Sequence, residues 1–266
     1  MFEKIAIVAD IHANKYALNR FLKYIEEENI KSVLNLGDFV QIGPNPYEVS
    51  KKILNDTRFI NILGNNETSL FEIDEASKND EIAHRLWTRE QMKENYEKIK
   101  LINETKIITR DNVKIFMIHS VENDINGMPS LYTDSNVSFI KDYEDFLADI
   151  VVFGHTHEKL YIEHNGKIFI NPGSLGCSKN GTIDFAVLQF DDKQNIKCDF
   201  KSLEYDKTEL IKDYYNNNVP DKEFILKSFF KYNDIKNSKI SFWNLAVFII
   251  FKIKILLIIN IMICKW

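Results

Sequence analysis

The chain has 266 residues, of which 34 are Lys or Arg and 39 are Asp or Glu, so its formal charge at pH 7 is −5. A hydrophobic fraction of 45% and a charged fraction of 27% exclude a disordered, collagen-like or multi-span membrane chain, and the acidic balance argues against a nucleic-acid groove. The three cysteines lack a disulfide or zinc-site spacing, and the N-terminal apolar run is too short for an export signal, so we expect a cytoplasmic protein.

The first part of the chain alternates between predicted strands and helices. Residues 4–9, 32–36 and 58–63 are short apolar runs typical of buried strands. Apolar residues three and four apart predict a helix around residues 17–25, and Asn45 and Pro46 are suited to begin a second helix over residues 46–54. This alternation predicts a parallel sheet with right-handed crossovers.

The middle and end of the chain are predicted to add an insertion, a second set of strands and two helices. Residues 68–104 read as a charged helical insertion, which we interpret as a lid. Further strands are predicted at residues 105–109, 113–118, 150–153, 183–190 and 196–203, and Asn165-Gly166 predicts a hairpin between strands at 159–163 and 167–170. Residues 171–174 are expected to turn the chain, and helices near 207–215 and 221–230 to close a mixed architecture.

Five of the predicted strands end in polar motifs. They are Asp10-Ile11-His12, Gly37-Asp38, Gly64-Asn65-Asn66-Glu67, His119 and Gly154-His155-Thr156-His157. Because reactive loops of such sheets lie beyond the carboxyl ends of the strands, we expect these motifs to meet at one site.

The side chains in these motifs offer imidazole, carboxylate and amide ligands. The candidate ligands are Asp10, His12, Asp38, Asn65, His119, His155 and His157. This donor set suits Mn²⁺, Fe, Zn²⁺ or Ni²⁺, with Mn²⁺ favoured, and seven ligands are too many for one ion. We therefore predict two divalent ions that share Asp38 and hold a hydroxide as the nucleophile. A single His or Asp at a strand end is more often a structural residue, but five motifs in this order favour a metal site.

In these motifs the chain resembles the calcineurin-like metallophosphoesterases, whose blocks read DxH, GD, GNH followed by an acid, a lone His, and GHxH. Residues 10–14, 43–46 and 171–174 resemble the small prokaryotic phosphodiesterase-like branch most. The resemblance implies an α/β fold of two packed mixed β-sheets flanked by helices, a four-layer sandwich over residues 1–231 with the lid insertion at about 68–104. It also assigns one ion to Asp10, His12, Asp38 and His157, and the other to Asp38, Asn65, His119 and His155.

The sequence departs from the family pattern at Asn66. The family usually has a His there, which protonates the leaving oxygen or steadies the transition state, whereas an amide donates a hydrogen bond but cannot act as a general acid. We expect Asn66 to contact the leaving side of the phosphate, together with Asp38 at the catalytic centre. The substrate would then have a good leaving group, or the enzyme would be slow.

A second departure concerns phosphate-binding arginines. Related protein phosphatases and dinucleoside tetraphosphate hydrolases carry an Asp-Arg pair after the GD block and an Arg before GN, and this chain has Gln41, Ile42 and Leu63 in those places. Substrate contacts must then come from elsewhere, and the candidates are Asn14 and, on the insertion, His84, Arg85 and Arg89. The alternative for the two arginines is an ordinary surface ion pair four residues apart, such as Arg85 with Glu81.

Residues 232–266 differ in composition from the rest. An apolar stretch from residue 240 is interrupted by Lys252 and Lys254, which penalise a membrane span. We interpret this segment as an appendage or read-through extension, ahead of peripheral membrane attachment through residues 240–264 and of a true span.

These observations predict a metal-dependent phosphoesterase that hydrolyses a phosphodiester or an activated phosphomonoester of a small phosphorylated substrate. Two alternatives stay open: a phosphoprotein or nucleotide-polyphosphate phosphatase, and a non-catalytic scaffold of the same fold. The substrate, the physiological metal and the oligomeric state are not predicted.

Overall fold

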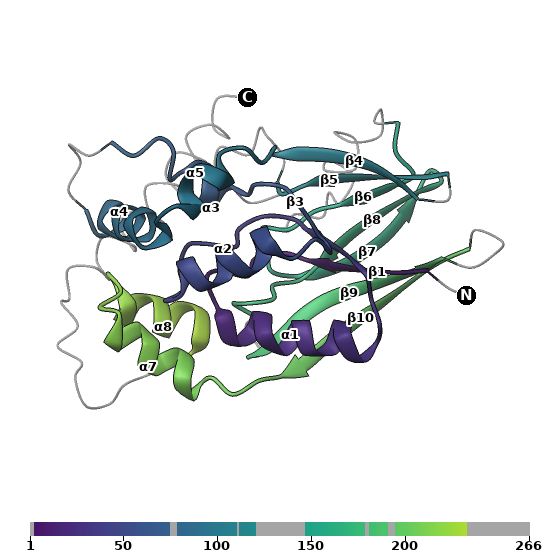
Figure 1. Cartoon of the computed structure of the whole chain (residues 1–266). Helices are drawn as coiled ribbons and strands as arrows, with labels where there is room; N and C mark the ends of the chain where they lie inside the picture. Colours follow the sequence, from purple (N-terminus) through teal and green to yellow (C-terminus); the bar gives the residue numbers. More distant parts are fainter. Residues whose placement is uncertain are drawn as a thin grey trace, which may run out of the picture. The chain divides into compact units, whose positions relative to one another are not determined.

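The structure is a computed structural model that describes residues 3–74, 79–110, 112–120, 147–178, 181–190 and 195–232 (Figure 1). The chain divides into a unit Met1–Lys231 and a second unit, Tyr232–Trp266. All helices and strands below belong to the first unit, whereas the predicted appendage and its proposed membrane attachment lie outside the described residues, except for Tyr232. Of the helices that the structure describes, none combines the length and the apolar character that crossing a bilayer requires.

The first sheet has the strand order β10-β9-β1-β2-β3. Strands β1 (Glu3–Val8), β2 (Ser32–Asn35) and β3 (Phe59–Asn61) are parallel, as the strand and helix alternation predicts. Strand β9 (Thr182–Phe190) runs antiparallel to both β1 and β10 (Ile196–Glu204). The sheet is therefore mixed, and its central strand comes from the start of the chain.

The second sheet has the order β4-β5-β6-β8-β7. Strands β5 (Val113–Ile118), β6 (Ile150–Val152) and β8 (Lys167–Pro172) are parallel, and β4 (Thr105–Arg110) and β7 (Lys159–His164) form antiparallel edges. The predicted hairpin is confirmed: Asn165 and Gly166 both have positive φ, as a tight two-residue turn requires. Strand β8 extends two residues further than expected, so the turn begins at Gly173, which has φ +82°.

The two sheets pack face to face. Successive side chains along β1 point alternately into an apolar core between the sheets and into a second core on the helix side. Ile5 and Ile7 of β1 point into an apolar cluster shared with Ile115 and Met117 of β5. Ala6 and Val8 point the other way, into a cluster shared with the helices. Burial on both faces explains why β1 is continuously apolar from Ile5 to Val8.

Helices α1 (Lys15–Glu27) and α2 (Pro46–Asn55) cover the outer face of the first sheet (Figure 1). Helices α7 (Thr208–Asn216) and α8 (Lys222–Phe230) follow β10, and α7 packs against α1. Pro46 occupies the first turn of α2, as predicted. The side chain of Asn45 does not cap the helix but donates to Asp213 on α7, so it joins two helices.

Helix α3 (Asn65–Thr68) carries the polar motif that follows β3, and the insertion after it contains α4 (Asp80–Met92) and α5 (Asn95–Ile99). Both α4 and α5 pack against α2, and their residues Met92 and Ile99 belong to the helix-side core. The insertion is thus built into the fold beside the first sheet, and its function as a lid stays a prediction.

Candidate metal centre

The loops after five strands meet at one edge of the two sheets, and backbone hydrogen bonds join them. The N–H of Asp10 donates to the carbonyl of Gly37 at 3.1 Å, and the N–H of His12 donates to that of Asp38 at 2.9 Å. Between the loops of the second sheet, the N–H of Gly154 donates to the carbonyl of His119 at 3.0 Å. The polar motifs are therefore held together by the backbone.

At this edge the backbone adopts left-handed conformations that residues other than glycine rarely adopt. The φ angles of Asp10, His12, Asp38, His155 and His157 are 55°, 47°, 55°, 71° and 59°. Each such residue costs about 1 to 3 kcal/mol and persists only where the surrounding structure fixes it. Strain gathered on five candidate ligands indicates that the fold places their side chains for function.

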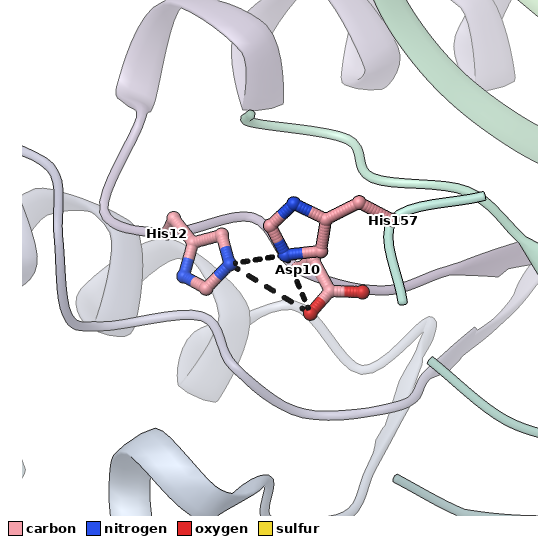
Figure 2. A group of neighbouring side chains, drawn as sticks. All are labelled: Asp10, His12 and His157. Atoms are coloured by element: carbon pink, nitrogen blue, oxygen red, sulfur yellow. Dashed lines mark hydrogen bonds and ion pairs between the residues drawn. The ribbon is translucent and has the colours of Figure 1, made fainter. Parts of the chain in front are cut away.

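Asp10, His12 and His157 form the first group of candidate ligands (Figure 2). The Nε2 atoms of His12 and His157 lie 3.0 Å apart, although the two residues are 145 positions apart in the sequence. Oδ1 of Asp10 lies 3.7 Å from Nε2 of His12 and 3.4 Å from Nε2 of His157. Three donor atoms from two different sheets therefore converge on one point.

Asp38, His119 and His155 form the second group. Nε2 of His119 lies 3.3 Å from Oδ2 of Asp38 and 4.0 Å from Oδ1 of Asp10, so the two groups adjoin. Asn65, which is exposed, places its Oδ1 2.9 Å from Nδ1 of His155. All seven predicted ligands thus lie in or beside the two groups, while the sharing of Asp38 between two ions stays a prediction.

Asn66 lies between the groups. Its Nδ2 donates to Oδ2 of Asp38 at 2.8 Å and lies 3.4 Å from Nδ1 of His12, and its backbone N–H donates to Oδ1 of Asp38 at 2.8 Å. The amide is aimed into the centre, where it can donate a hydrogen bond to a bound group.

The donor atoms fit divalent metal ions. Oδ1 of Asp10 and Nε2 of His119 are buried and have no hydrogen-bond partner among the residues that the structure describes, which is costly unless a ligand completes them. Two ligand atoms that each lie about 2.1 Å from one ion are about 3.0 Å apart in octahedral geometry and about 3.4 Å apart in tetrahedral geometry. The distances between the donor atoms of the first group are close to these values. Nδ1 of His119 lies 2.7 Å from the carbonyl of Leu36 and donates to it, so in the neutral ring the lone pair is on Nε2, which can bind an ion once its proton is displaced.

The electrostatics of the centre also favour a cation. Burial disfavours a charged His119, but the carboxylates of Asp38 and Asp10 outweigh it and raise its pKa to about 10. Burial likewise opposes ionisation of Asp10, yet the surrounding histidines, His157 foremost, hold its pKa well below the usual range. Two ionised carboxylates in a buried site attract positive charge, which a divalent ion would supply.

Glu67 supports the centre, and the sequence analysis assigned it no role. Its fully buried carboxylate accepts backbone N–H groups from Asp38 at 2.7 Å, Phe39 at 2.7 Å, Val40 at 3.1 Å and Gly64 at 2.9 Å. Burial beside Asp38 raises its pKa to about 7, although the backbone donors oppose the rise. Its position directly after the Asn65-Asn66 pair was the sequence feature that could have indicated this supporting role. Glu67 ties the loop of Asp38 to the loop of Asn65.

Two glycines, Gly64 and Gly154, and the turn at residues 171–174 also hold the ligand loops in place. A Cβ on Gly64 would overlap Oδ1 of Asp38, and one on Gly154 would lie 3.1 Å from Oδ2 of Asp10, which confirms that backbone must approach the ligands closely here. Ser174 Oγ donates to the carbonyl of Asp10 at 2.9 Å, and Asn171 Nδ2 donates to that of Gly154 at 2.7 Å.

The predicted substrate contacts lie elsewhere. Asn14 is fully buried: its Oδ1 caps α1 through the N–H of Ala17, and its Nδ2 donates to the carbonyl of Gly176 and the hydroxyl of Tyr205. Both polar atoms are thus engaged within the fold, so this placement lends no support to a substrate contact.

The cationic residues of the insertion are also engaged within the chain. Arg85 forms an ion pair with Glu81, which is the surface pairing considered from the sequence, and Arg89 has a partner as well. His84 is buried rather than presented to a substrate. Substrate binding by Arg85 or Arg89 stays a prediction.

The residues in place of the relatives' Asp-Arg pair and second Arg have structural roles. The Gln41 amide donates to the carbonyl of Asn66 and, at 2.7 Å, to Oγ of Ser69, and Leu63 is buried in the helix-side core. Ile42 adopts a left-handed conformation with φ 74°.

Comparisons with known proteins agree with this geometry. The family model described as the calcineurin-like phosphoesterase superfamily domain matches residues 4–193. An uncharacterized protein of Methanocaldococcus jannaschii is 28% identical in an alignment of 210 residues that covers 71% of this chain and 83% of that protein. A phosphodiesterase of the same organism is 23% identical over 192 residues, covering 72% of this chain and 95% of that protein. The crystal structure of a metallophosphoesterase from Sphaerobacter thermophilus superposes with a TM-score of 0.64 at 20% identity, covering 82% of this chain and 95% of the other, which shows a common fold.

Proposed function

Because the chain belongs to the calcineurin-like phosphoesterase superfamily, we propose that it is a hydrolase with two divalent metal ions that cleaves a phosphodiester or an activated phosphomonoester. The observation that carries this proposal is the convergence of two adjoining ligand groups on two buried atoms, Oδ1 of Asp10 and Nε2 of His119, for which the described part of the chain offers no hydrogen-bond partner. A non-catalytic scaffold has no need of such an open and strained arrangement.

The chain's own residues would share the work as follows. The first group, Asp10, His12 and His157, and the second group, Asp38, His119 and His155 with Asn65, would hold one ion each, with Asp38 shared between them. Ions held there, with Mn²⁺ as the favoured metal, would supply Lewis-acid activation of water and would neutralise charge on the phosphate.

Asn66 determines which esters suit this centre. Its amide, held at 2.8 Å from Asp38, can donate a hydrogen bond to a phosphate or departing oxygen but has no proton to transfer. A general acid typically contributes about 10² to 10⁴ in rate, so a centre without one favours leaving groups that depart as stable anions. This is why we propose an activated monoester or a diester of a small phosphorylated molecule.

The proposal is tested with the full chain in Mn²⁺, comparing hydrolysis of bis-p-nitrophenyl phosphate with that of p-nitrophenyl phosphate. We expect turnover that depends on the metal, favours the diester and is lost in Asp38→Ala. Absence of turnover on either ester, in protein that binds two Mn²⁺ ions per chain, would favour a scaffold instead.

Asn66→His is the matched variant for the role of the amide. A histidine there could protonate the leaving oxygen, so turnover of phenyl esters should rise by about tenfold or more relative to nitrophenyl esters. Equal changes for the two leaving groups would contradict the role that we assign to residue 66.

A further inference from the structure

His84 links three separate parts of the fold from a buried position on α4. It is 7% exposed. Its Nε2 accepts the backbone N–H of Ile42 at 3.0 Å, so its Nδ1 carries the proton and faces the carbonyl of Pro220 at 3.3 Å. Burial lowers the pKa of His84 to about 4, which keeps the ring neutral and preserves one donor and one acceptor at neutral pH.

The first of these bonds fixes a strained loop. Ile42 has φ 74°, a conformation that is a genuine outlier for a β-branched residue and costs about 1 to 3 kcal/mol. Such a conformation needs an external contact to hold it. The acceptor that His84 offers to the Ile42 N–H is a contact of this kind.

The loop in turn lies directly on a candidate ligand. A Cβ on Gly43 would overlap the carbonyl oxygen of His12 and lie 2.8 Å from the carbonyl of Ala13. The N–H of Asn45 also donates to the Ala13 carbonyl at 3.0 Å. Because the two backbones touch here, a shift of Ile42 and Gly43 has to be followed by His12.

The second bond leads to the same ligand group from the other side. Pro220 lies in the connection between α7 and α8, and α8 carries Phe229. The Phe229 ring lies against His157, with 6.4 Å between the ring centroids. Both contacts of His84 therefore point to the group of Asp10, His12 and His157.

We propose that His84 is a positioning residue that holds the loop over His12 and thereby sets the metal affinity of the Asp10, His12 and His157 group. The inference rests on the proposed metal centre. Contacts behind metal ligands typically change affinity by about 10- to 100-fold. Loss of the Ile42 contact should therefore weaken one ion by about this factor and leave the ion at Asp38, His119 and His155 unchanged.

Two conservative variants separate the contacts of His84. The amide oxygen of glutamine in His84→Gln reaches the place of Nε2 and can accept the Ile42 N–H. The shorter asparagine in His84→Asn reaches only the place of Nδ1, so it can donate to Pro220 but leaves the Ile42 N–H without an acceptor. The measurement is calorimetric titration of the metal-free full chain with Mn²⁺, with thermal unfolding of the same samples as a control for folding.

We expect two sites in the wild-type protein, one site weakened about 10- to 100-fold in His84→Asn, and near wild-type binding in His84→Gln. Two unchanged sites in both variants would overturn the inference, and so would equal weakening of both sites. A wild-type protein that binds no Mn²⁺ would overturn the proposed centre itself, and the role of His84 with it, so the two failures are distinguishable.

Discussion

Replacing His84 with glutamine removes a buried group that titrates and retains an acceptor for Ile42. The pKa of His84 falls from 6.5 to about 4 in the folded chain because the ring is buried, with a small opposing effect of the Pro220 carbonyl. As the pH falls, the unfolded chain therefore binds this proton before the folded chain does. The stability contributed by the neutral ring is fully present above about pH 7 and is lost as the pH falls from 6.5 towards 4.

The size of this effect follows from the difference between the two pKa values. A difference of about 2.5 pH units at about 1.4 kcal/mol per unit gives a limit of about 3.4 kcal/mol, of which about 2 kcal/mol is lost by pH 5. The assay is urea unfolding of the metal-free wild type and of His84→Gln at pH 7.5 and pH 5, with a chelator present. The wild type should lose about 2 kcal/mol more than the variant, because contributions from the other histidines cancel in the difference. Parallel losses in the two proteins would refute a neutral, buried His84.

Three further substitutions test the support of the centre. Gly64→Ala should displace the Asp38 carboxylate, weaken Mn²⁺ binding and cost about 1 to 3 kcal/mol in urea unfolding. The control is Gly166→Ala, whose Cβ would meet no atom of the described residues and should leave metal binding intact. Equal Mn²⁺ binding by the two variants would contradict the expected clash between a Cβ at residue 64 and Asp38. Glu67→Ala leaves four buried N–H groups without their acceptor and should cost about 4 kcal/mol or more in the same assay, so a loss below about 1 kcal/mol would show that Glu67 does not tie the loops. Asn14→Ala removes a helix cap and two further bonds and should cost about 2 to 3 kcal/mol without changing KM, and a raised KM in folded protein would restore its predicted contact with substrate.

The sequence by itself indicated the candidate ligands and the edge of the sheet where they lie. Apolar runs identified the parallel strands β1, β2 and β3, and a parallel arrangement places the residues that follow them at the same edge. Asp10, Asp38 and Asn65 could therefore be brought together from local patterns alone. The dipeptide Asn165-Gly166 also predicted the hairpin, since both residues readily adopt positive φ.

The spacing of the residues did not show which side chains meet across the two sheets; the family resemblance implied a grouping, and the tertiary structure brings those side chains together. The first group joins Asp10 and His12 of one sheet to His157 of the other, and such contacts over 145 residues depend on how the sheets pack rather than on local propensity. The same holds for the residues behind the ligands. Glu67 had no predicted role and His84 was a candidate substrate contact, and neither buried hydrogen bond was predicted, because a bond to a distant backbone N–H leaves no periodic signal.

Asn14 shows the physical reason most directly. Next to the first metal motif in the sequence, its amide looks available for a substrate, but the fold closes the loop of Gly176 and the ring of Tyr205 over it. A buried amide must satisfy its donors and acceptor inside the protein, and here it does so as a cap and a cross-link. The sequence determined which chemical groups the chain carries, whereas packing determined which of them are exposed and hence which can contact a ligand.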